Sequence, residues 1–406
     1  MQGGLIVQKY GGSSVANIER IQKVAERIVN YKKRGFSLVV VVSAMADTTD
    51  ELIEMADKIN PEAPEREMDM LLSTGEQISV SLLAMAVHKL GVEAISFTGG
   101  QVGIITDGNY TKARIVKIQA DKIREELKRG RVVIVAGFQG ITIAHDITTL
   151  GRGGSDLTAV ALAKELTANE CEIYTDVEGI YTTDPRIEPK AQKIKMITFD
   201  EMLEMASLGA QVMQPRSIEV AKKFNVPIHV RSSFSQNPGT MIIKEAVKME
   251  GAVITGVTLN KNEAKITICD VPDRPGAAAH IFKELSEGGV NVDMIVQNVS
   301  HTRKTDLSFT IPKADVNKTM KITKKTAKEI GAGEVLQDED IARIAVVGVG
   351  MKSHPGVAAD MFETLAENKI NIEMISTSDI SISCIIKKKF VETAVKELHE
   401  KFKLAK

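Results

Sequence analysis

A lysine followed by two glycines lies directly after a short apolar run near the start of the chain. In the stretch LIVQKYGGSS, Leu5–Val7 is typical of a buried parallel strand. Gly11 and Gly12 let the backbone turn sharply and expose its N–H groups, and a helix is expected to follow. A helix N-terminus attracts phosphate, and Lys9 can reach the same anion. The lysine does not follow the glycines as it does in a P-loop, and a plain Gly-Gly turn with a solvated lysine would also fit.

A second glycine-rich segment, LGRGGSD at Leu150–Asp156, opens another predicted helix. Arg152 can bind a carboxylate or a phosphate through two parallel hydrogen bonds, and the glycines allow close approach of the backbone. Asp156 has two interpretations. It is either an acidic residue that favours the first turn of the helix, or a group that orients Lys9 or helps to hold a metal-bound phosphate.

Glu76 interrupts the apolar stripe of a predicted helix, which contains Leu72, Val80, Leu83 and Val87. Burying an unpaired carboxylate costs on the order of 3–5 kcal/mol, so Glu76 should have a partner. That partner is either a structural arginine or the amine of a small-molecule substrate.

The segment TDVEGIYTTDPR follows another predicted strand. It is either a well-capped turn or part of a nucleotide site, in which Tyr181 packs beside the base. Two anion loops with basic residues, and no histidine or serine nucleophile pattern, favour phosphoryl transfer. This reaction mainly needs in-line positioning and neutralisation of charge, which Lys9 with Mg²⁺ would provide.

Buried strands that alternate with helices predict an open, mostly parallel α/β sheet with helices on both faces. Ligands bind at the carboxyl ends of the strands in such sheets, and all these loops are expected at that edge. Asn17 is a candidate cap for the first helix. The predicted strands are 5–7, 38–42, 94–97, 132–135, 171–174 and 228–230, and the predicted helices are 18–34, 50–59, 66–90, 121–129 and 157–166, with two more before the last strand.

The chain has 406 residues and a net charge of −1. This length predicts roughly two to three domains, and the charge gives no reason to expect nucleic acid or an anionic membrane as a partner. Cys171, Cys269 and Cys384 lie in apolar runs without disulfide or metal-ligand spacing, so buried free thiols are expected. Without a signal peptide or an apolar run near the ~18 residues of a membrane span, a soluble cytoplasmic protein is expected.

The C-terminal part contains an internal repeat. Pro275 and Gly276 recur 80 residues later as Pro355 and Gly356, and Asn291 recurs at the same interval as Asn371. Two β-α-β-β-α-β units are predicted. The first runs to a fourth strand near 333–336, whereas the second stops short of one. The preceding strand 252–259 is therefore predicted to complete the second unit, which makes the first unit an insertion.

The motifs KYGGSSV, SAMADTTDEL, STGEQ, FTGGQ, TTLGRGGSD and TDVEGIYTTDPR closely resemble those of the aspartate kinases in the amino-acid-kinase superfamily, and the paired units resemble ACT domains. The resemblance covers essentially the whole chain. It implies ATP-dependent phosphorylation of the side-chain carboxylate of L-aspartate, the first step towards lysine, threonine and methionine. The expected domains are a catalytic domain at 1–235, a linker at 236–251, the strand 252–260, a first ACT domain at 261–340 and a second at 341–406.

The same resemblance implies the site residues. Lys9 and Asp156 would be catalytic, and ATP would contact Lys9, Gly11, Gly12, Ser13, Thr175, Asp176, Tyr181, Asp184 and Arg186. Aspartate would contact Ser43, Thr49, Glu76, Arg152, Gly153, Gly154 and Ser155, with Glu76 on its amine and Arg152 on a carboxylate. No metal is expected beyond ATP-bound Mg²⁺.

ACT domains of this family pair side by side and bind effector amino acids, which here implies feedback by lysine, threonine or both. The matching positions are Asp273, Pro275, Gly276, Asn291, Val292, Asp293, Gln297, His354, Pro355, Gly356, Asn371 and Ile372, unless Asn291 and the Pro-Gly pairs are only turn residues. A homodimer through the ACT domains is expected, and Met249 is a candidate internal start for a separate regulatory subunit. Alternatives are a kinase of the same fold that acts on glutamate, N-acetylglutamate or UMP, and a non-catalytic ACT sensor.

Overall fold

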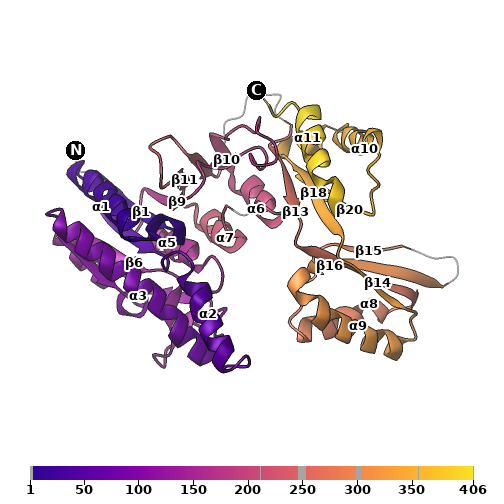
Figure 1. Cartoon of the computed structure of the whole chain (residues 1–406), viewed down its shortest axis with the longest axis horizontal. Coiled ribbons are helices and arrows are strands. Elements are labelled where there is room, and N and C mark those ends of the chain that lie inside the picture. Colours follow the sequence, from indigo (N-terminus) through magenta and orange to yellow (C-terminus); the bar gives the residue numbers. More distant parts are fainter. Residues whose placement is uncertain (1–2, 211, 246–252, 299–302, 355, 406) are drawn as a thin grey trace. The chain divides into compact units, whose positions relative to one another are not determined.

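The computed structural model describes residues 3–210, 212–245, 253–298, 303–354 and 356–405. They form two compact units. The first comprises the described residues of Met1–Ile180, Lys193–Ala206 and Gln211–Val247, and the second those of Tyr181–Gln192, Ser207–Ala210 and Lys248–Lys406. Figure 1 labels the elements of both units. Met249, Pro355 and the start of the predicted strand at Ala252 lie outside the described residues.

The first unit is built on an eight-stranded sheet of order β10-β12-β11-β9-β1-β2-β6-β3. All pairings in it are parallel except that of β11 with β12, so the predicted mostly parallel sheet is confirmed. β2 and β6 are almost entirely apolar because both faces of the sheet are covered there. The strands are β1 (Leu5–Tyr10), β2 (Ser37–Val42), β3 (Ala94–Phe97), β6 (Val132–Ala136), β9 (Glu170–Thr175), β10 (Met196–Thr198), β11 (Ile228–Ser232) and β12 (Thr240–Ile243).

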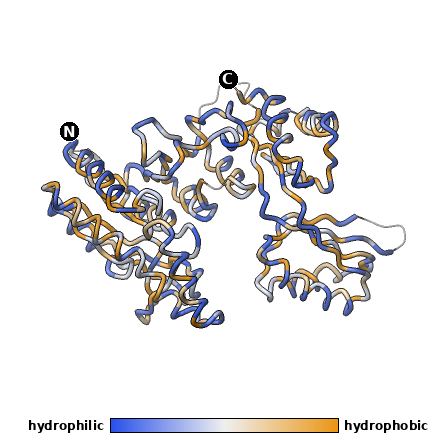
Figure 2. Tube along the Cα trace, viewed as in Figure 1, coloured by the Kyte–Doolittle hydropathy of each residue, from blue (hydrophilic) through white to orange (hydrophobic). Residues whose placement is uncertain are grey.

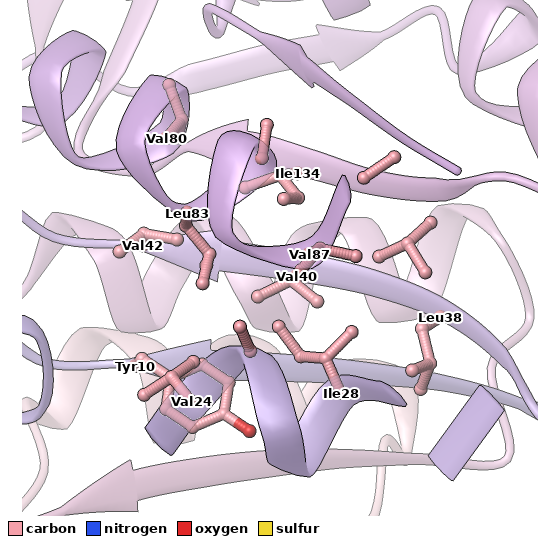
Figure 3. Close-up of a cluster of buried hydrophobic side chains, with 14 of the residues drawn as sticks. Tyr10, Val24, Ile28, Leu38, Val40, Val42, Val80, Leu83, Val87 and Ile134 are labelled. Carbon is pink, nitrogen blue, oxygen red and sulfur yellow. The ribbon is translucent and has the colours of Figure 1, made fainter. Parts of the chain in front are cut away.

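Helices cover both faces of this sheet. On one face, α1 and α3 pack against β1, β2 and β6, as Figure 3 shows for Val24 and Ile28 of α1 and for Leu83 and Val87 of α3. On the other face, α5 packs against β1, β2 and β9, and α7 packs against α5. The helices of this unit are α1 (Ile18–Lys33), α2 (Thr48–Ile59), α3 (Glu65–Lys89), α4 (Asp121–Lys128), α5 (Gly154–Glu165), α6 (Phe199–Ser207) and α7 (Pro215–Phe224).

Three features of this unit differ from the sequence prediction. A small sheet of order β5-β4-β7-β8 was not predicted, because its strands are only three or four residues long; they are β4 (Ile104–Thr106), β5 (Ile115–Ile118), β7 (Gln139–Ile141) and β8 (Ile147–Thr149). The glycine loop leads into a short 3₁₀ helix, Gly12–Val15, and α1 begins only at Ile18, after its cap Asn17. Thr49 lies in the first turn of α2 rather than in a loop.

The expectation that the chain has no apolar segment of membrane-spanning length is wrong for α3. This 25-residue helix is long and apolar enough to cross a membrane, by length and composition alone. Half of its apolar window is buried inside the protein, and the helix packs on the central sheet. It therefore has the features of a core helix.

The second unit contains two four-stranded sheets that repeat one topology. In the first repeat the order is β15-β16-β14-β17, with α8 and α9 on one face; in the second it is β13-β18-β20-β19, with α10 and α11. The elements are β13 (Gly256–Asn260), β14 (Glu263–Pro272), α8 (Ala277–Glu287), β15 (Ile295–Gln297), β16 (Lys304–Pro312), α9 (Val316–Ile330), β17 (Val335–Asp338), β18 (Ile341–Val347), α10 (Val357–Glu367), β19 (Met374–Thr377), β20 (Ser381–Lys387) and α11 (Val391–Lys401).

The predicted pairing of the strand before the first repeat is confirmed. β13 pairs antiparallel with β18 and so supplies the fourth strand of the second sheet, which makes the first repeat an insertion in the chain. The hydrophobic and hydrophilic positions alternate along the helices of both units (Figure 2), as expected for helices that cover one face of a sheet.

The prediction of three buried thiols is correct for Cys171 and Cys384 and wrong for Cys269, which is only partly buried. Burial raises the pKa of the Cys384 thiol to about 12, so this group stays protonated at neutral pH.

Candidate active site

Lys9 and Asp156 meet at the carboxyl edge of the central sheet. Lys9 is the fifth residue of β1, Asp156 lies in the first turn of α5, and Lys9 Nζ is 2.6 Å from Asp156 Oδ1. Their side chains are only 13% and 8% exposed. The predicted convergence of these two residues is therefore confirmed, and it places an ammonium group at the end of β1.

The glycine loop is fixed to the end of β9 and to the loop that follows β2. Gly11 N donates to Tyr174 O at 3.3 Å, and Ala46 N donates to Gly12 O at 3.2 Å. A Cβ on Gly12 would lie 2.9 Å from the carbonyl oxygen of Ala44, so this position has no room for a side chain. Among the described residues, the N–H groups of Gly12 and Ser13 have no acceptor, and Ser13 is exposed. A Cβ on Gly11 would lie 3.5 Å from Lys9 Nζ, so the loop runs close to the ammonium group. The loop therefore offers free donors next to the ammonium group.

The carboxyl group of Glu76 is bonded to the loop that follows β2. Ala44 N donates to Glu76 Oε1 at 3.1 Å, while the buried Oε2 has no hydrogen-bond partner within the described part of the chain. Burial raises the pKa of the carboxyl group to about 7. The sequence left two partners open for Glu76, a structural arginine and the amine of a substrate. No arginine among the described residues pairs with Glu76. Its carboxylate can therefore accept a cationic ligand.

Two further predicted residues follow β2 in the chain. Ser43 is partly buried at the end of β2, and its N–H donates to Tyr10 O at 3.1 Å. Thr49 is also partly buried, in the first turn of α2. The sequence analysis did not identify Gly75, whose lack of a side chain lets α3 pack closely against Ala44. A Cβ on Gly75 would lie 2.8 Å from the Cβ of Ala44.

The segment around Arg152 has the backbone conformation that its glycines allow. Gly151 and Gly153 have φ values of 77° and 73°, a region that other residues seldom adopt. Gly154 and Ser155 begin α5 and are buried, whereas Arg152 is exposed. Arg216, which the sequence analysis missed, holds the base of this segment by donating to Leu150 O at 2.9 Å and to Ala113 O at 2.8 Å.

Asp69 is a second residue that sequence analysis missed. It is buried on α3, and its carboxylate accepts hydrogen bonds from Thr111 N, Thr149 N and Thr149 Oγ1. Asp69 thereby ties α3 to the small sheet. A charged residue on the buried side of an amphipathic helix is the signal that could have identified it, as it did for Glu76.

The TDVEGIYTTDPR segment is divided between the two units. Thr175 ends β9 and donates through Oγ1 to Asp176 at 3.0 Å, and both belong to the first unit. Tyr181, Asp184 and Arg186 belong to the second unit. Arg186 Nη2 donates to Asp184 at 2.7 Å, and Arg186 N donates to the same carboxylate at 2.9 Å, which is the arrangement of a capped turn.

The predicted effector positions of each repeat lie in two segments, one just before α8 or α10 and one after the end of that helix. Helix α8 begins directly after Gly276, which has a φ of 95°, and α10 begins after Gly356. Val292 and Ile372 are partly buried. The other described positions are exposed: Asp273, Pro275, Gly276, Asn291, Asp293, Gln297, His354, Gly356 and Asn371. Asp293 already has a cationic partner, because its Oδ2 lies 2.6 Å from Nη2 of the buried Arg343.

A group of acidic and histidine side chains on β9 and β11 could in principle hold a metal ion: Glu170, Glu172 and His229. However, Glu172 accepts hydrogen bonds from Gln8 at 2.7 Å and from Tyr31 at 2.7 Å, and it pairs with Arg231 at 2.9 Å. Tyr174 also donates to it at 3.2 Å, so a guanidinium group and three neutral donors already satisfy this carboxylate. The cluster therefore fits a buried structural network rather than a metal site.

Comparison with known proteins agrees with this architecture. The sequence model of the amino acid kinase family matches residues 4–232, and an ACT domain model matches residues 270–326 and 344–402. An aspartate kinase of Pseudomonas putida is 53% identical over 401 residues, which is 98% of both chains.

Two solved structures of E. coli aspartokinase III are similar to this chain. One, in complex with aspartate and ADP in the R-state, has a TM-score of 0.83; the other, in complex with lysine and aspartate in the T-state, has a TM-score of 0.77. Each is 25% identical, and each alignment covers 98% of this chain and 99% of the other. The chain belongs to the amino acid kinase family and, within it, to the aspartate kinases that carry ACT domains.

Proposed function

We propose that the chain transfers the γ-phosphoryl group of ATP to the side-chain carboxylate of L-aspartate and so forms 4-phospho-L-aspartate and ADP. One carboxylate oxygen attacks the γ-phosphorus in line, and the bond between that phosphorus and the bridging oxygen of ADP breaks. This reaction requires no proton transfer. The protein must position the two substrates and neutralise the charge of the transferring group.

The observation that carries the proposal is the pair of Lys9 and Asp156 beside free backbone donors. The Lys9 ammonium group and the N–H groups of Gly12 and Ser13 are suited to the phosphates, with Gly11 giving the backbone access. Thr175 and Asp176 would contribute from the end of β9. Asp156 holds Lys9 in place through their ion pair. Its negative charge is compatible with a nearby phosphate when that phosphate carries a bound metal ion.

Mg²⁺ would accompany ATP and reduce the charge of its phosphates. An anionic side chain next to a phosphate-binding lysine fits such an ion, and Asp156 is that side chain here. The roles of Tyr181, Asp184 and Arg186 as further nucleotide contacts remain part of the proposal.

Glu76 supports an amino acid with a free amine as the acceptor. Its Oε2 has no partner among the described residues, and an ammonium group would supply one. N-acetylglutamate would leave this carboxylate buried and unpaired, at a cost of about 1–3 kcal/mol or more. Arg152 would hold a carboxylate of aspartate, and Ser43, Thr49, Gly153, Gly154 and Ser155 would line the rest of its site.

Lysine, threonine or both are proposed as effectors at the ACT units. The complex of E. coli aspartokinase III with lysine supports the first of these. The starts of α8 and α10 offer backbone N–H groups for an effector carboxylate. A homodimer through the ACT units and a cytoplasmic location are further parts of the proposal.

A hydroxamate assay tests the substrate. The protein is incubated with ATP, Mg²⁺ and hydroxylamine together with single amino acids, because hydroxylamine traps an acyl phosphate. Hydroxamate is expected with aspartate. A signal with glutamate and none with aspartate would overturn the proposal, and no signal with any amino acid would favour the non-catalytic ACT sensor.

A further inference from the structure

The loop Tyr181–Gln192 is held by the second ACT sheet. Its residue Thr182 accepts a hydrogen bond from Val257 N of β13 at 2.7 Å. The side chain of Thr182 also contacts α11, since its Oγ1 lies 2.9 Å from His399 Nε2. One residue of the loop is thus bonded to two different elements that surround the second ACT core.

Thr182 also closes the loop. Its N–H donates to Gln192 O at 2.9 Å, and its Oγ1 accepts from Gln192 N at 2.9 Å. Between these ends, Ile187 packs against the apolar cluster formed by β13, β18, β20, α10 and α11. The loop is therefore anchored at both its base and its middle, and every anchor lies in the same unit.

His399 is an unusual residue for its position. The buried side of α11 otherwise consists of Val391, Ala394, Val395 and Leu398, and the side chain of His399 is also buried, at 1% exposure. Burial lowers the pKa of its ring, which is therefore neutral at pH 7. A polar ring in an apolar core needs a partner, and Thr182 is the side chain that its Nε2 contacts.

We propose that His399 is a positioning residue that fixes the loop Tyr181–Gln192 on the second ACT sheet, so that this sheet sets the conformation of the loop. The functional consequence rests on the proposed function, in which Tyr181, Asp184 and Arg186 of this loop contact ATP. Under that assignment, a change at β13 or α11 alters ATP binding through Thr182. The aspartate contacts, which lie in the first unit, are not expected to respond.

Four variants of the full chain test this proposal by steady-state kinetics: His399→Ala, His399→Gln, Thr182→Val and the double variant Thr182→Val/His399→Ala. His399→Ala is expected to raise KM for ATP by roughly fivefold, the effect of one neutral hydrogen bond, and to leave KM for aspartate unchanged. Thr182→Val should raise KM for ATP at least as much, because it also removes the hydrogen bond that Thr182 Oγ1 accepts from Gln192 N. The double variant should be no worse than Thr182→Val alone, because His399→Ala then removes no further hydrogen bond. His399→Gln keeps a hydrogen-bonding group and should restore much of the wild-type KM. His280→Ala, a partly exposed histidine in the first repeat, is the matched control.

Hydrogen–deuterium exchange separates failure of the anchor from failure of the proposed function. In His399→Ala, amides of residues 181–192 are expected to exchange at least several-fold faster, while those of β18 and β20 keep their protection, which shows that the fold is intact. Unchanged exchange in the loop would overturn the anchor whatever the activity. Faster exchange with an unchanged KM for ATP would keep the anchor and overturn the nucleotide role of the loop. Additive effects of Thr182→Val and His399→Ala would show that the two residues do not act together, and this result would overturn the proposal.

Discussion

Lys9 Nζ and Asp156 Oδ1 lie 2.6 Å apart, although 146 residues separate them in the chain. The pair joins the end of β1 to the first turn of α5, at the edge where ligands bind in parallel α/β sheets. Both side chains are largely buried, so water competes weakly with a ligand for the ammonium group. This relationship connects the two glycine-rich loops in one site.

Replacing Lys9 by alanine should remove most of the catalytic power. A fixed cation that neutralises charge on the transferring group contributes about 10²–10³-fold to kcat. We expect Lys9→Ala to lower kcat by about this factor and to change KM for aspartate little. The measurement is a coupled ADP assay, with Lys23→Ala on the exposed side of α1 as the control. A near-normal kcat would remove Lys9 from the mechanism.

Asp156→Asn distinguishes the two interpretations of that residue. If Asp156 fixes Lys9, loss of its charge should lower kcat by roughly 10–100-fold, the effect of one charge-assisted hydrogen bond. If it only favours the helix dipole, the variant should lose about 0.3–1 kcal/mol of stability and keep its kcat. Asp121→Asn is the matched control, because Asp121 occupies the first turn of α4 with an exposed side chain. Kinetics and thermal unfolding of both variants decide between the two.

Much of the fold could be predicted from sequence because the central strands are buried on both faces. Strands such as Leu38–Val42 and Ala94–Phe97 are uninterrupted apolar or nearly apolar runs, and the structure places them within one residue of the prediction. The small sheet was missed because strands such as Ile104–Thr106 are too short to show periodicity. The pairing of β13 with β18 was predicted from the repeat, which left one copy a strand short.

The candidate site could be predicted in part. Lys9, Glu76 and Asp156 stand out as charged residues in buried patterns, and the structure brings Lys9 and Asp156 together. The sequence left the partner of Glu76 open, because residue spacing along a helix gives no information on tertiary contacts with an arginine. The packing of Tyr181–Gln192 with the second ACT core also depends on tertiary contacts, so no local pattern could indicate it.

Asp293→Ala should weaken feedback inhibition. In the structure Asp293 pairs with Arg343, which also pairs with Glu263 at 2.8 Å, so the buried Arg343 keeps a partner when Asp293 is lost. If Asp293 binds the effector amine, as an acidic residue among the proposed effector positions could, the concentration of lysine or threonine needed for half-inhibition should rise by about tenfold or more. Glu287→Ala, in an exposed pair on α8, is the control. Unchanged inhibition in Asp293→Ala would move the effector site elsewhere.

Aspartate binding should depend on the charge of Glu76. The pKa of this carboxyl group is raised to about 7 by burial, so it is increasingly protonated below pH 7 and then cannot pair with an ammonium group. KM for aspartate is expected to rise by up to about tenfold per pH unit below this value, while kcat changes less because bound substrate keeps Glu76 ionised. Glu76→Gln should raise KM by about 10–100-fold and abolish this part of the pH dependence. Glu54→Gln, on the exposed side of α2, should retain the wild-type profile.

The same carboxylate should reduce the stability of the ligand-free protein at high pH. Its folded-state pKa, about 7, lies above the ordinary value of 4.5, so folding favours the protonated form. The stability that Glu76 contributes is fully present below pH 4.5 and is lost as the pH rises through 7. At pH 8, ligand-free Glu76→Gln should therefore be more stable than wild type, by about 1–3 kcal/mol. Urea unfolding at pH 5 and pH 8 measures the difference, which should shrink at pH 5 and on addition of aspartate at pH 8. A variant less stable than wild type at pH 8 without aspartate would show that Glu76 has a structural partner and is not held ready for the substrate amine.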